Sequence, residues 1–353
     1  MPILLDPRTD PRWDAYVRSH PEATVYHLGA WAPILQGAYG FEPRYLALAG
    51  DGRLRGVIPL MRKKGIVSDA RLRSIPVFSY GGPLGDTPDD EAALLEAART
   101  EAARSGVRGL MVNTGVRRLE APQYGSEEIL PRWVLALPDD LDALRASWRK
   151  SSNNLFRSLR KADRSDLLFR EATSADDVRS VHALYVRTMR GHRSLPRTWR
   201  QLRLERDLLG GHFRAFVVSH DGRDVAGGVY HLFGDTIELI YNGSDERSLE
   251  LRPNHALYWG VMRWAQEHGL RNIDVGGAYA DTPLARFKLQ WGAQPQPRFR
   301  LNHRPGGGTT RAESIASIGY GAEGSERRIV AFGWRHVPLA VLRAGAHVAY
   351  RYI

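Results

Sequence analysis

The chain has 353 residues, of which 43% are hydrophobic and 25% are charged, and this balance excludes a disordered or fibrous protein. Its 50 lysine and arginine residues outnumber 39 acidic residues, and the net charge of +11 favours polyanionic partners such as nucleic acid, nucleotide-linked substrates or an anionic lipid surface. There is no cysteine, which excludes disulfides and cysteine nucleophiles, and no apolar stretch is long enough to predict a spanning helix.

The first half of the chain predicts a hairpin, a third strand, a helix and a fourth strand. Residues 45–63, YLALAGDGRLRGVIPLMRK, have the pattern of two strands around an Asp-Gly turn. The segment 71–80, RLRSIPVFSY, supplies the third strand. A helix over 87–106 begins with acidic residues and ends at Gly106, and a short buried strand, VRGLMVN, follows it.

A basic connecting helix is predicted over residues 138–165. Its inward face is apolar, and its other face carries seven cations: Arg145, Arg149, Lys150, Arg157, Arg160, Lys161 and Arg164. Such a face could bind the phosphate backbone of an RNA, or it could be an ordinary charged surface that contacts only solvent.

The second half repeats the order of the first. Residues 213–233 form a hairpin pattern around a second DGR turn, 170 residues after the first. A strand (235–244), a helix closed by Gly269 and the strand LRNIDVGG follow. The chain therefore predicts two similar α/β units, 1–137 and 166–303. Residues 304–353 form a basic, aromatic tail, which lies on an anionic membrane surface or packs back onto the second unit. Pro338 and Gly345 argue against a long regular helix in this tail.

Several segments resemble the Fem family, the nonribosomal aminoacyl transferases that build peptidoglycan cross-bridges. They are YNGSDERSLELRPNHALYWGVMRWAQEHGLRNIDVGGA, ARFKLQWGA, NNLFRSLRKA and SYGGPLGD. The chain is also similar to the acyltransferase-like proteins of envelope polysaccharide and exosortase systems, and the tail is closer to that branch. The resemblance implies two tandem GNAT-like (acetyltransferase-type) domains, each a mixed, mostly antiparallel sheet flanked by helices, with the second domain catalytic. Two features depart from the Fem pattern: no coiled-coil arm is present, and Gln36 stands near the position of the family's substrate lysine.

Lys288 and Asp274 are the candidate catalytic residues. Only five of the 50 basic residues are lysine, and Lys288 lies in the family's Phe-Lys motif, where its ammonium would stabilise the oxyanion of acyl transfer. Phe287 and Trp291 would surround it with a wall of low dielectric constant. Asp274 closes a buried strand, where it orients an amine, accepts its proton, or simply binds the amides of the glycine turn.

The candidate substrate-binding residues lie at strand ends, at helix starts and in a basic loop. Tyr80 and Tyr241 end the third strand of their units, and Asp86 follows the Gly-Pro segment. Arg190 belongs to the loop YVRTMRGHRSLPRTWR, which suits a phosphate clamp. Arg252 and Asn254 flank the proline at the start of the second unit's helix. Phe287 and Trp291, the two aromatic residues beside Lys288, are candidate substrate-binding residues as well.

The sequence leaves three functions open. The first is transfer of an aminoacyl group from aminoacyl-tRNA to an amine of a cell-envelope or peptidoglycan precursor, with charged tRNA and a nucleotide- or lipid-linked precursor as partners. The second is an acyl-CoA-dependent N- or O-acyltransferase of exopolysaccharide or envelope biosynthesis; the helix start SLELRPNHAL lacks the glycines of a pyrophosphate loop, which disfavours it. The third is a binding protein without catalysis. We expect a cytoplasmic location, peripheral at the inner membrane face if the tail binds lipid, with no permanently bound cofactor and no metal.

Overall fold

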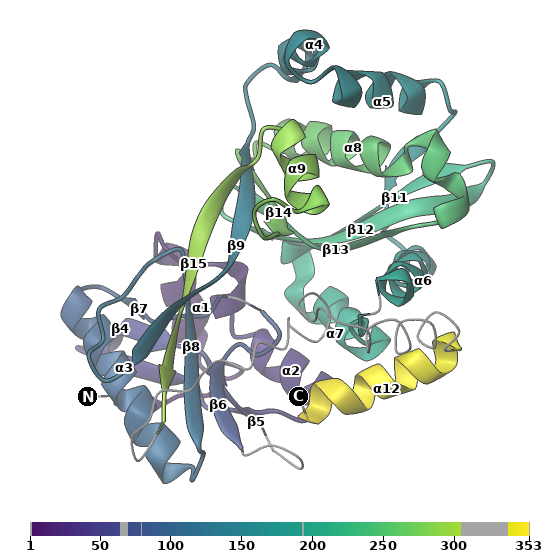
Figure 1. Ribbon diagram of the computed structural model, residues 1–353. Coiled ribbons are helices and arrows are strands. Elements are labelled where there is room, and N and C mark those ends of the chain that lie inside the picture. Colours follow the sequence, from purple (N-terminus) through teal and green to yellow (C-terminus); the bar gives the residue numbers. More distant parts are fainter. Residues whose placement is uncertain (1, 64–69, 79, 193, 305–337, 353) are drawn as a thin grey trace.

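The computed structural model describes residues 2–63, 70–78, 80–192, 194–304 and 338–352. Within these residues the strands form one sheet of four, in the order β1-β3-β4-β7, and one of eleven, in the order β10-β11-β12-β13-β14-β9-β15-β8-β6-β5-β2. The longer sheet passes through both halves of the molecule, because β9 (Gly125–Ala136) and β15 (Gln294–His303) are paired and extend from one half into the other (Figure 1).

The first half places its main helix between the two sheets. Leu94 and Ala98 of this helix, α3, pack with Leu48 of the short sheet and Leu72 of the long one. The strands of this half are β1 (Pro2–Leu4), β2 (Glu42–Pro43), β3 (Leu46–Gly50), β4 (Arg53–Ile58), β5 (Leu60–Lys63), β6 (Arg71–Ser74), β7 (Leu84–Gly85) and β8 (Gly109–Gly115). Its helices are α1 (Pro11–Ser19), the 3₁₀ turn η1 (Val25–His27), α2 (Trp31–Tyr39) and α3 (Pro88–Arg104).

The second half is a sheet covered by helices on both faces. Helix α6 packs on one face through Val181, and α8 packs on the other through Leu257 (Figure 1). The strands are β10 (Leu168–Glu171), β11 (Phe213–His220), β12 (Arg223–Phe233), β13 (Thr236–Ser244) and β14 (Asn272–Gly277). The helices are α4 (Leu141–Ser151), α5 (Asn153–Asp163), α6 (Ala175–Gly191), α7 (Trp199–Leu209), η2 (Gly210–His212), η3 (Glu246–Leu251), α8 (Pro253–Glu267) and α9 (Pro283–Gln290).

The predicted repeat is present in the structure. Both Asp-Gly turns have positive φ at both residues, 51° and 78° in the first and 48° and 71° in the second, as a two-residue hairpin turn of the primed type requires. In each half a helix connects two parallel, paired strands: α3 lies between β6 and β8 in the sequence, and α8 lies between β13 and β14. The α/β class and the duplicated order of elements are therefore confirmed.

The predicted connecting helix is two helices, because it breaks at Ser152. This residue has φ −144° and ψ 64°, which is outside the helical region, and it lies between α4 and α5. The apolar face is nevertheless as predicted: Trp148, Leu155 and Leu159 are buried in one core cluster with Leu257 of α8. The break lets both short amphipathic helices follow the curved outer surface of the second half.

The tail contains a helix, which corrects the expectation that Pro338 and Gly345 would prevent one. Helix α12 (Leu339–Tyr352) begins directly after the proline, where a missing N–H is tolerated, and accommodates the glycine at a cost of about 1 kcal/mol. Leu342 and Ala346, four residues apart, are buried against α2 and α6, so the helix bridges the two halves. Residues 305–337 of the predicted tail lie outside the described residues. None of the helices described here is long and apolar enough to cross a membrane.

Gly243 in the YNGS segment is fixed by packing. A Cβ atom there would collide with the backbone of Leu184 and Tyr185 in α6. We expect Gly243→Ala to lower the free energy of unfolding by about 1–3 kcal/mol, measured by urea denaturation, because α6 has to move away from the sheet. Gly211→Ala is the matched control, since nothing lies within 4 Å of its Cβ position, and it should change stability by less than about 0.5 kcal/mol. Equal effects of the two substitutions would contradict this packing argument.

Candidate active site

Asp274 lies where the two halves of the molecule meet. It is 2% exposed, near the end of β14, and its Oδ1 atom accepts the N–H of Gly276 at 2.8 Å. Its Oδ2 atom accepts the hydroxyl of Tyr80 at 3.0 Å and lies 3.6 Å from Nη1 of Arg132. Tyr80 comes from the first half and Arg132 from β9, so three distant segments of the chain converge on one buried carboxylate.

Lys288 reaches the same glycine turn from α9. The residue is 2% exposed, and its Nζ donates to the carbonyl oxygen of Gly277 at 3.0 Å. Gly276 has φ +81°, a backbone conformation that favours glycine, and the Nζ atom lies 3.7 Å from the position that a Cβ atom would occupy there. Asp274 of β14 and Lys288 of α9 therefore bind two adjacent residues of one turn, Gly276 and Gly277.

The environment of Lys288 lowers the pKa of its ammonium. Burial is the main cause; the charge of Asp274 raises the pKa and that of Arg298 lowers it, and the result is a pKa of about 7 instead of the usual 10.5. At neutral pH the amine is thus close to half protonated. Such a group acts as a cation towards an oxyanion and also gives up its proton readily.

Two arginines enclose Tyr80. The guanidinium carbons of Arg132 and Arg298 lie 5.8 Å and 5.6 Å from the centre of its ring, and Tyr26 stacks on the ring at 5.4 Å. Arg298 also donates from Nε to the carbonyl oxygen of Leu130 at 2.7 Å. These contacts hold the hydroxyl of Tyr80 towards Asp274 and keep the site rich in positive charge.

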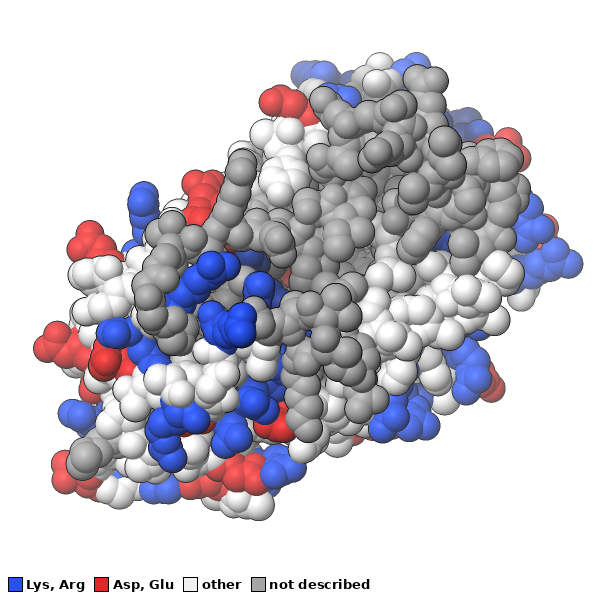
Figure 2. All heavy atoms as spheres, turned by 60° about the horizontal axis from the view of Figure 1, so that its bottom comes forward, with Lys and Arg blue, Asp and Glu red and all other residues white. Residues whose placement is uncertain are grey.

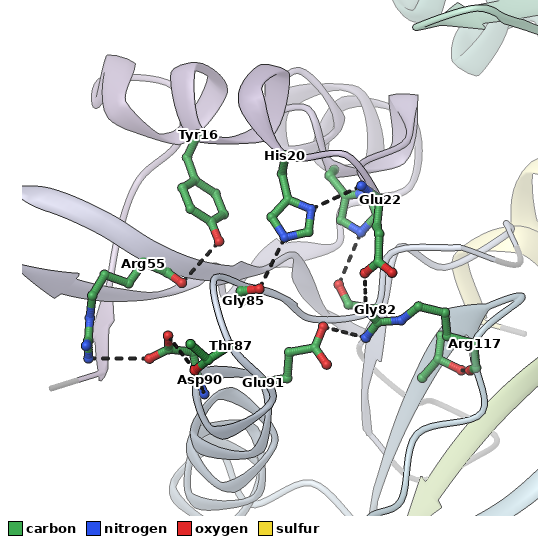
Figure 3. Close-up of polar contacts among 12 residues, drawn as sticks. Tyr16, His20, Glu22, Arg55, Gly82, Gly85, Thr87, Asp90, Glu91 and Arg117 are labelled. Carbon is green, nitrogen blue, oxygen red and sulfur yellow. Dashed lines mark hydrogen bonds and ion pairs between the residues drawn. The ribbon is translucent and has the colours of Figure 1, made fainter.

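The segment after Tyr80 is held by two histidines. The Nε2 atoms of His27 and His20 each lie 3.2 Å from a carbonyl oxygen, that of Gly82 for the first and that of Gly85 for the second. Figure 3 shows His20 directed at Gly85 from α1. Because a carbonyl can only accept, both histidines donate, and they fix the backbone that carries Tyr80.

Glu238 is a second carboxyl group beside Asp274. It is paired in register with Asp274 across β13 and β14. Desolvation is the first cause that raises the pKa of Glu238 well above its usual value, and the charge of Asp274 is the second. Glu238 therefore holds its proton more tightly than an exposed glutamic acid, directly beside Asp274.

A family model for the acetyltransferase (GNAT) domain matches residues 149–289, a span that contains both Asp274 and Lys288. Residues 149–289 are a GNAT domain. The prediction of an acyltransferase of the GNAT type is confirmed by this match. No curated protein matches the sequence significantly.

Solved structures share the fold over most of the chain. FemX has a TM-score of 0.67 at 16% identity, over 86% of this chain and 97% of its own. L-PGS from Bacillus licheniformis has a TM-score of 0.56 at 13% identity, over 90% and 96%. A tandem GNAT protein from the clavulanic acid biosynthesis pathway has a TM-score of 0.50 at 13% identity, over 87% and 99%. At these low identities the TM-scores and coverages show a common fold alone, and it is the tandem GNAT-like fold that the Fem resemblance of the sequence predicted.

The predicted aromatic pair lies on the α8 side of α9. Trp291 is 1% exposed and packs edge-on against Trp148 at 5.5 Å, so it belongs to the core of the GNAT domain. Phe287 contacts Tyr258 at 5.3 Å and His255 at 5.5 Å. Both rings help to hold α9 in place, and in this way they position Lys288. Their contacts are with residues of α4 and α8, so they do not form the predicted wall around the Lys288 nitrogen.

The other predicted substrate-binding residues are not brought to Lys288 by the contacts of the described residues. Tyr241 is buried within β13 and stacks on Tyr185 of α6 at 4.2 Å. Asn254 donates to the hydroxyl oxygen of Ser244 at 3.2 Å. Three more lie elsewhere: Asp86 accepts from the hydroxyl of Tyr16 at 3.0 Å, Arg190 ends α6, and exposed Arg252 caps α8.

Sequence reasoning missed Glu238, Arg132, Arg298 and Tyr26. A glutamate inside the otherwise apolar strand TIELIY was the available signal for Glu238, since a charged residue within a buried strand is rare without a partner. The two arginines carried no such signal, because the chain has 45 arginines. They belong to the site only because β9 and β15 cross from one half of the sheet to the other.

Proposed function

We propose that the protein transfers an aminoacyl group from aminoacyl-tRNA to an amine of a cell-envelope or peptidoglycan precursor. The observation that carries the proposal is the buried ammonium of Lys288 on the glycine turn, next to the Asp274 carboxylate. A binding protein without catalysis would have no use for a desolvated lysine of shifted pKa in a GNAT domain.

The chemistry follows from these groups. The acceptor amine attacks the ester carbonyl carbon, and the new C–N bond places negative charge on the carbonyl oxygen. The Lys288 ammonium has three donors and uses one on Gly277, so it keeps donors for this oxyanion. The C–O bond to the tRNA ribose then breaks, and the leaving oxygen takes a proton from Lys288. The amine loses a proton in turn, which restores the ammonium.

The start of α8 supports tRNA over CoA as the donor. In an acetyl-CoA enzyme the pyrophosphate would meet free N–H groups at this helix start. Here Pro253 removes one donor, and the preceding turn η3 with its cap carries three acidic residues, Asp245, Glu246 and Glu250. They outnumber the two cations of that segment, Arg247 and Arg252, so a pyrophosphate would meet repulsion.

The second candidate is an acyl-CoA-dependent N- or O-acyltransferase of exopolysaccharide or envelope biosynthesis. It is favoured by the description of the matching domain as an acetyltransferase. The catalytic groups would act in the same way. The C–S bond to CoA would break in place of the C–O bond to the ribose, so a thiol would leave, and in O-acylation a hydroxyl would attack in place of the amine.

A donor assay separates the two. Purified protein is given nucleotide- and lipid-linked peptidoglycan precursors with either labelled aminoacyl-tRNA or labelled acyl-CoA. We expect label to move from aminoacyl-tRNA only, and RNase to abolish the transfer. Transfer from acyl-CoA that RNase does not affect would replace the first candidate by the second.

A further inference from the structure

A set of cations lies on one face of the long sheet, and we call Lys63, Arg71, Arg73 and Arg300 the cation row. Lys63 of β5 is directly opposite Arg71 of β6, so their side chains share a face. Arg73 follows two residues later on the same face, and its Nη2 atom lies 3.1 Å from Sδ of Met111 in β8. Arg300 of β15 closes the row from the other side of β8, where its Nε donates to Oδ1 of Asn113 at 2.9 Å.

The cation row has too little negative charge to neutralise it. Arg300 pairs with Glu127 at 3.4 Å, whereas within the described part of the chain no ion pair joins Lys63, Arg71 or Arg73 to a carboxylate. Desolvation, then the neighbouring arginines, lower the pKa of Lys63 to about 8 and that of Arg73 to about 10. Like charges directly opposite one another destabilise a sheet, so this arrangement calls for an anion.

Arg298 connects the cation row to the active site. It lies two residues before Arg300 on β15, and its charge lowers the pKa of both Arg300 and Lys288. Cations therefore lie on both sides of β8, on β15 and on β6 and β5, and Arg298 links them to Lys288. Figure 2 shows Lys and Arg side chains gathered around a hollow in the left half of that view, where few acidic side chains lie among them.

We propose that the cation row binds consecutive phosphates of the single-stranded end of an RNA whose esterified terminus reaches Lys288. This inference rests on the proposed function and assigns the donor's path on the protein. The row crosses four strands, a distance of about 14 Å, so it is long enough to follow successive phosphates along one RNA strand. The phosphates of CoA, in contrast, are grouped around a single nucleotide.

Binding of a short RNA tests the assignment without any chemistry. The probe is a fluorescent single strand of about 12 nucleotides that ends in CCA, and its anisotropy is followed from 50 to 200 mM salt. We expect the variant Lys63→Gln/Arg71→Gln/Arg73→Gln to bind at least about tenfold more weakly, with the slope of log K against log salt reduced by about 2, since each phosphate contact contributes about 0.7. Arg53→Gln/Arg203→Gln/Arg223→Gln removes the same charge at exposed positions off the row and should keep the wild-type slope.

Each result decides the matter. Equal affinity and slope in the two triple variants would overturn the assignment, and so would loss of CoA binding with RNA binding retained in the row variant. If the row variant fails to fold, Arg71→Gln alone, at a half-buried side chain, should still lower the slope by about 0.7. If the row binds RNA but the protein transfers no aminoacyl group, the proposed function is refuted and the role of the row in RNA binding stands. If the row variant transfers aminoacyl groups at the wild-type rate at limiting RNA, the proposed function stands and the role of the row is refuted.

Discussion

Replacement of Lys288 with methionine is expected to lower the rate of acyl transfer about 100- to 1,000-fold. Methionine fills a similar volume, so α9 should keep its place, but it donates nothing to the oxyanion. Removal of one preorganised donor from such a site costs about that factor in enzymes in general. The measurement is single-turnover transfer at saturating donor, so that binding does not enter the rate.

Stability provides the control for this variant. The folded pKa of Lys288 is about 7, below the 10.5 of the unfolded chain, so the unfolded state binds more protons between these values. Burial of the ammonium thus destabilises the wild type below pH 7, and the penalty disappears as the pH rises towards 10.5. Lys288→Met should be at least as stable as the wild type at pH 6, with the difference shrinking by pH 10. A variant that lost both activity and stability at pH 6 would show that Lys288 serves the fold.

Local patterns made much of the fold predictable. The Asp-Gly hairpins, the glycine-closed helices and the apolar stripe of Trp148, Leu155 and Leu159 depend on neighbours in sequence, and each is present. The break at Ser152 and the helix after Pro338 were not predictable in this way. Both are decided by the surface on which the segment packs, which only the assembled fold supplies.

The sequence pointed to Asp274 and Lys288 in the GNAT domain and to Tyr80 in the first half, but not to the contacts between the halves. Asp274 and Lys288 lie 14 residues apart in one recognisable segment, and they meet at one turn. Their partners Tyr80 and Arg132 come from the other half of the sheet, 194 residues and 142 residues from Asp274. Contacts of that range leave no periodicity in the sequence, so the pairing of Tyr80 with Asp274 was not predictable although Tyr80 itself was a candidate. Arg132 carried no signal of its own, because arginine is common in this chain.

Replacement of Asp274 with asparagine is expected to have the largest effect on stability, a loss of about 3–5 kcal/mol at pH 7. The asparagine oxygen can still accept from Gly276 or Tyr80. It cannot neutralise Arg132, however, and breaking a buried ion pair by removal of one partner leaves an uncompensated charge. Urea denaturation measures the loss. Asp86→Asn is the matched control: Asp86 is exposed, and its side chain accepts a hydrogen bond from Tyr16 that an asparagine oxygen can also accept, so its replacement should change stability by less than about 0.5 kcal/mol.

The pH dependence of this variant distinguishes a role in the reaction from a role in the fold. Asp274 raises the pKa of Lys288, so without it the ammonium is lost at lower pH, and the descending limb of the pH–rate profile should move towards acid. An unchanged limb would mean that Asp274 only binds the glycine turn.

Glu238 makes a further consequence testable in the same variant. The charge of Asp274 helps to keep Glu238 protonated, so in Asp274→Asn the pKa of Glu238 falls and its carboxylate partly replaces the lost charge. The double variant Asp274→Asn/Glu238→Gln should therefore lose more stability than the sum of the two single variants, because Glu238→Gln alone removes a group that is already neutral. Additive losses would mean that the two carboxyl groups, although paired in register on adjacent strands, do not share one charge.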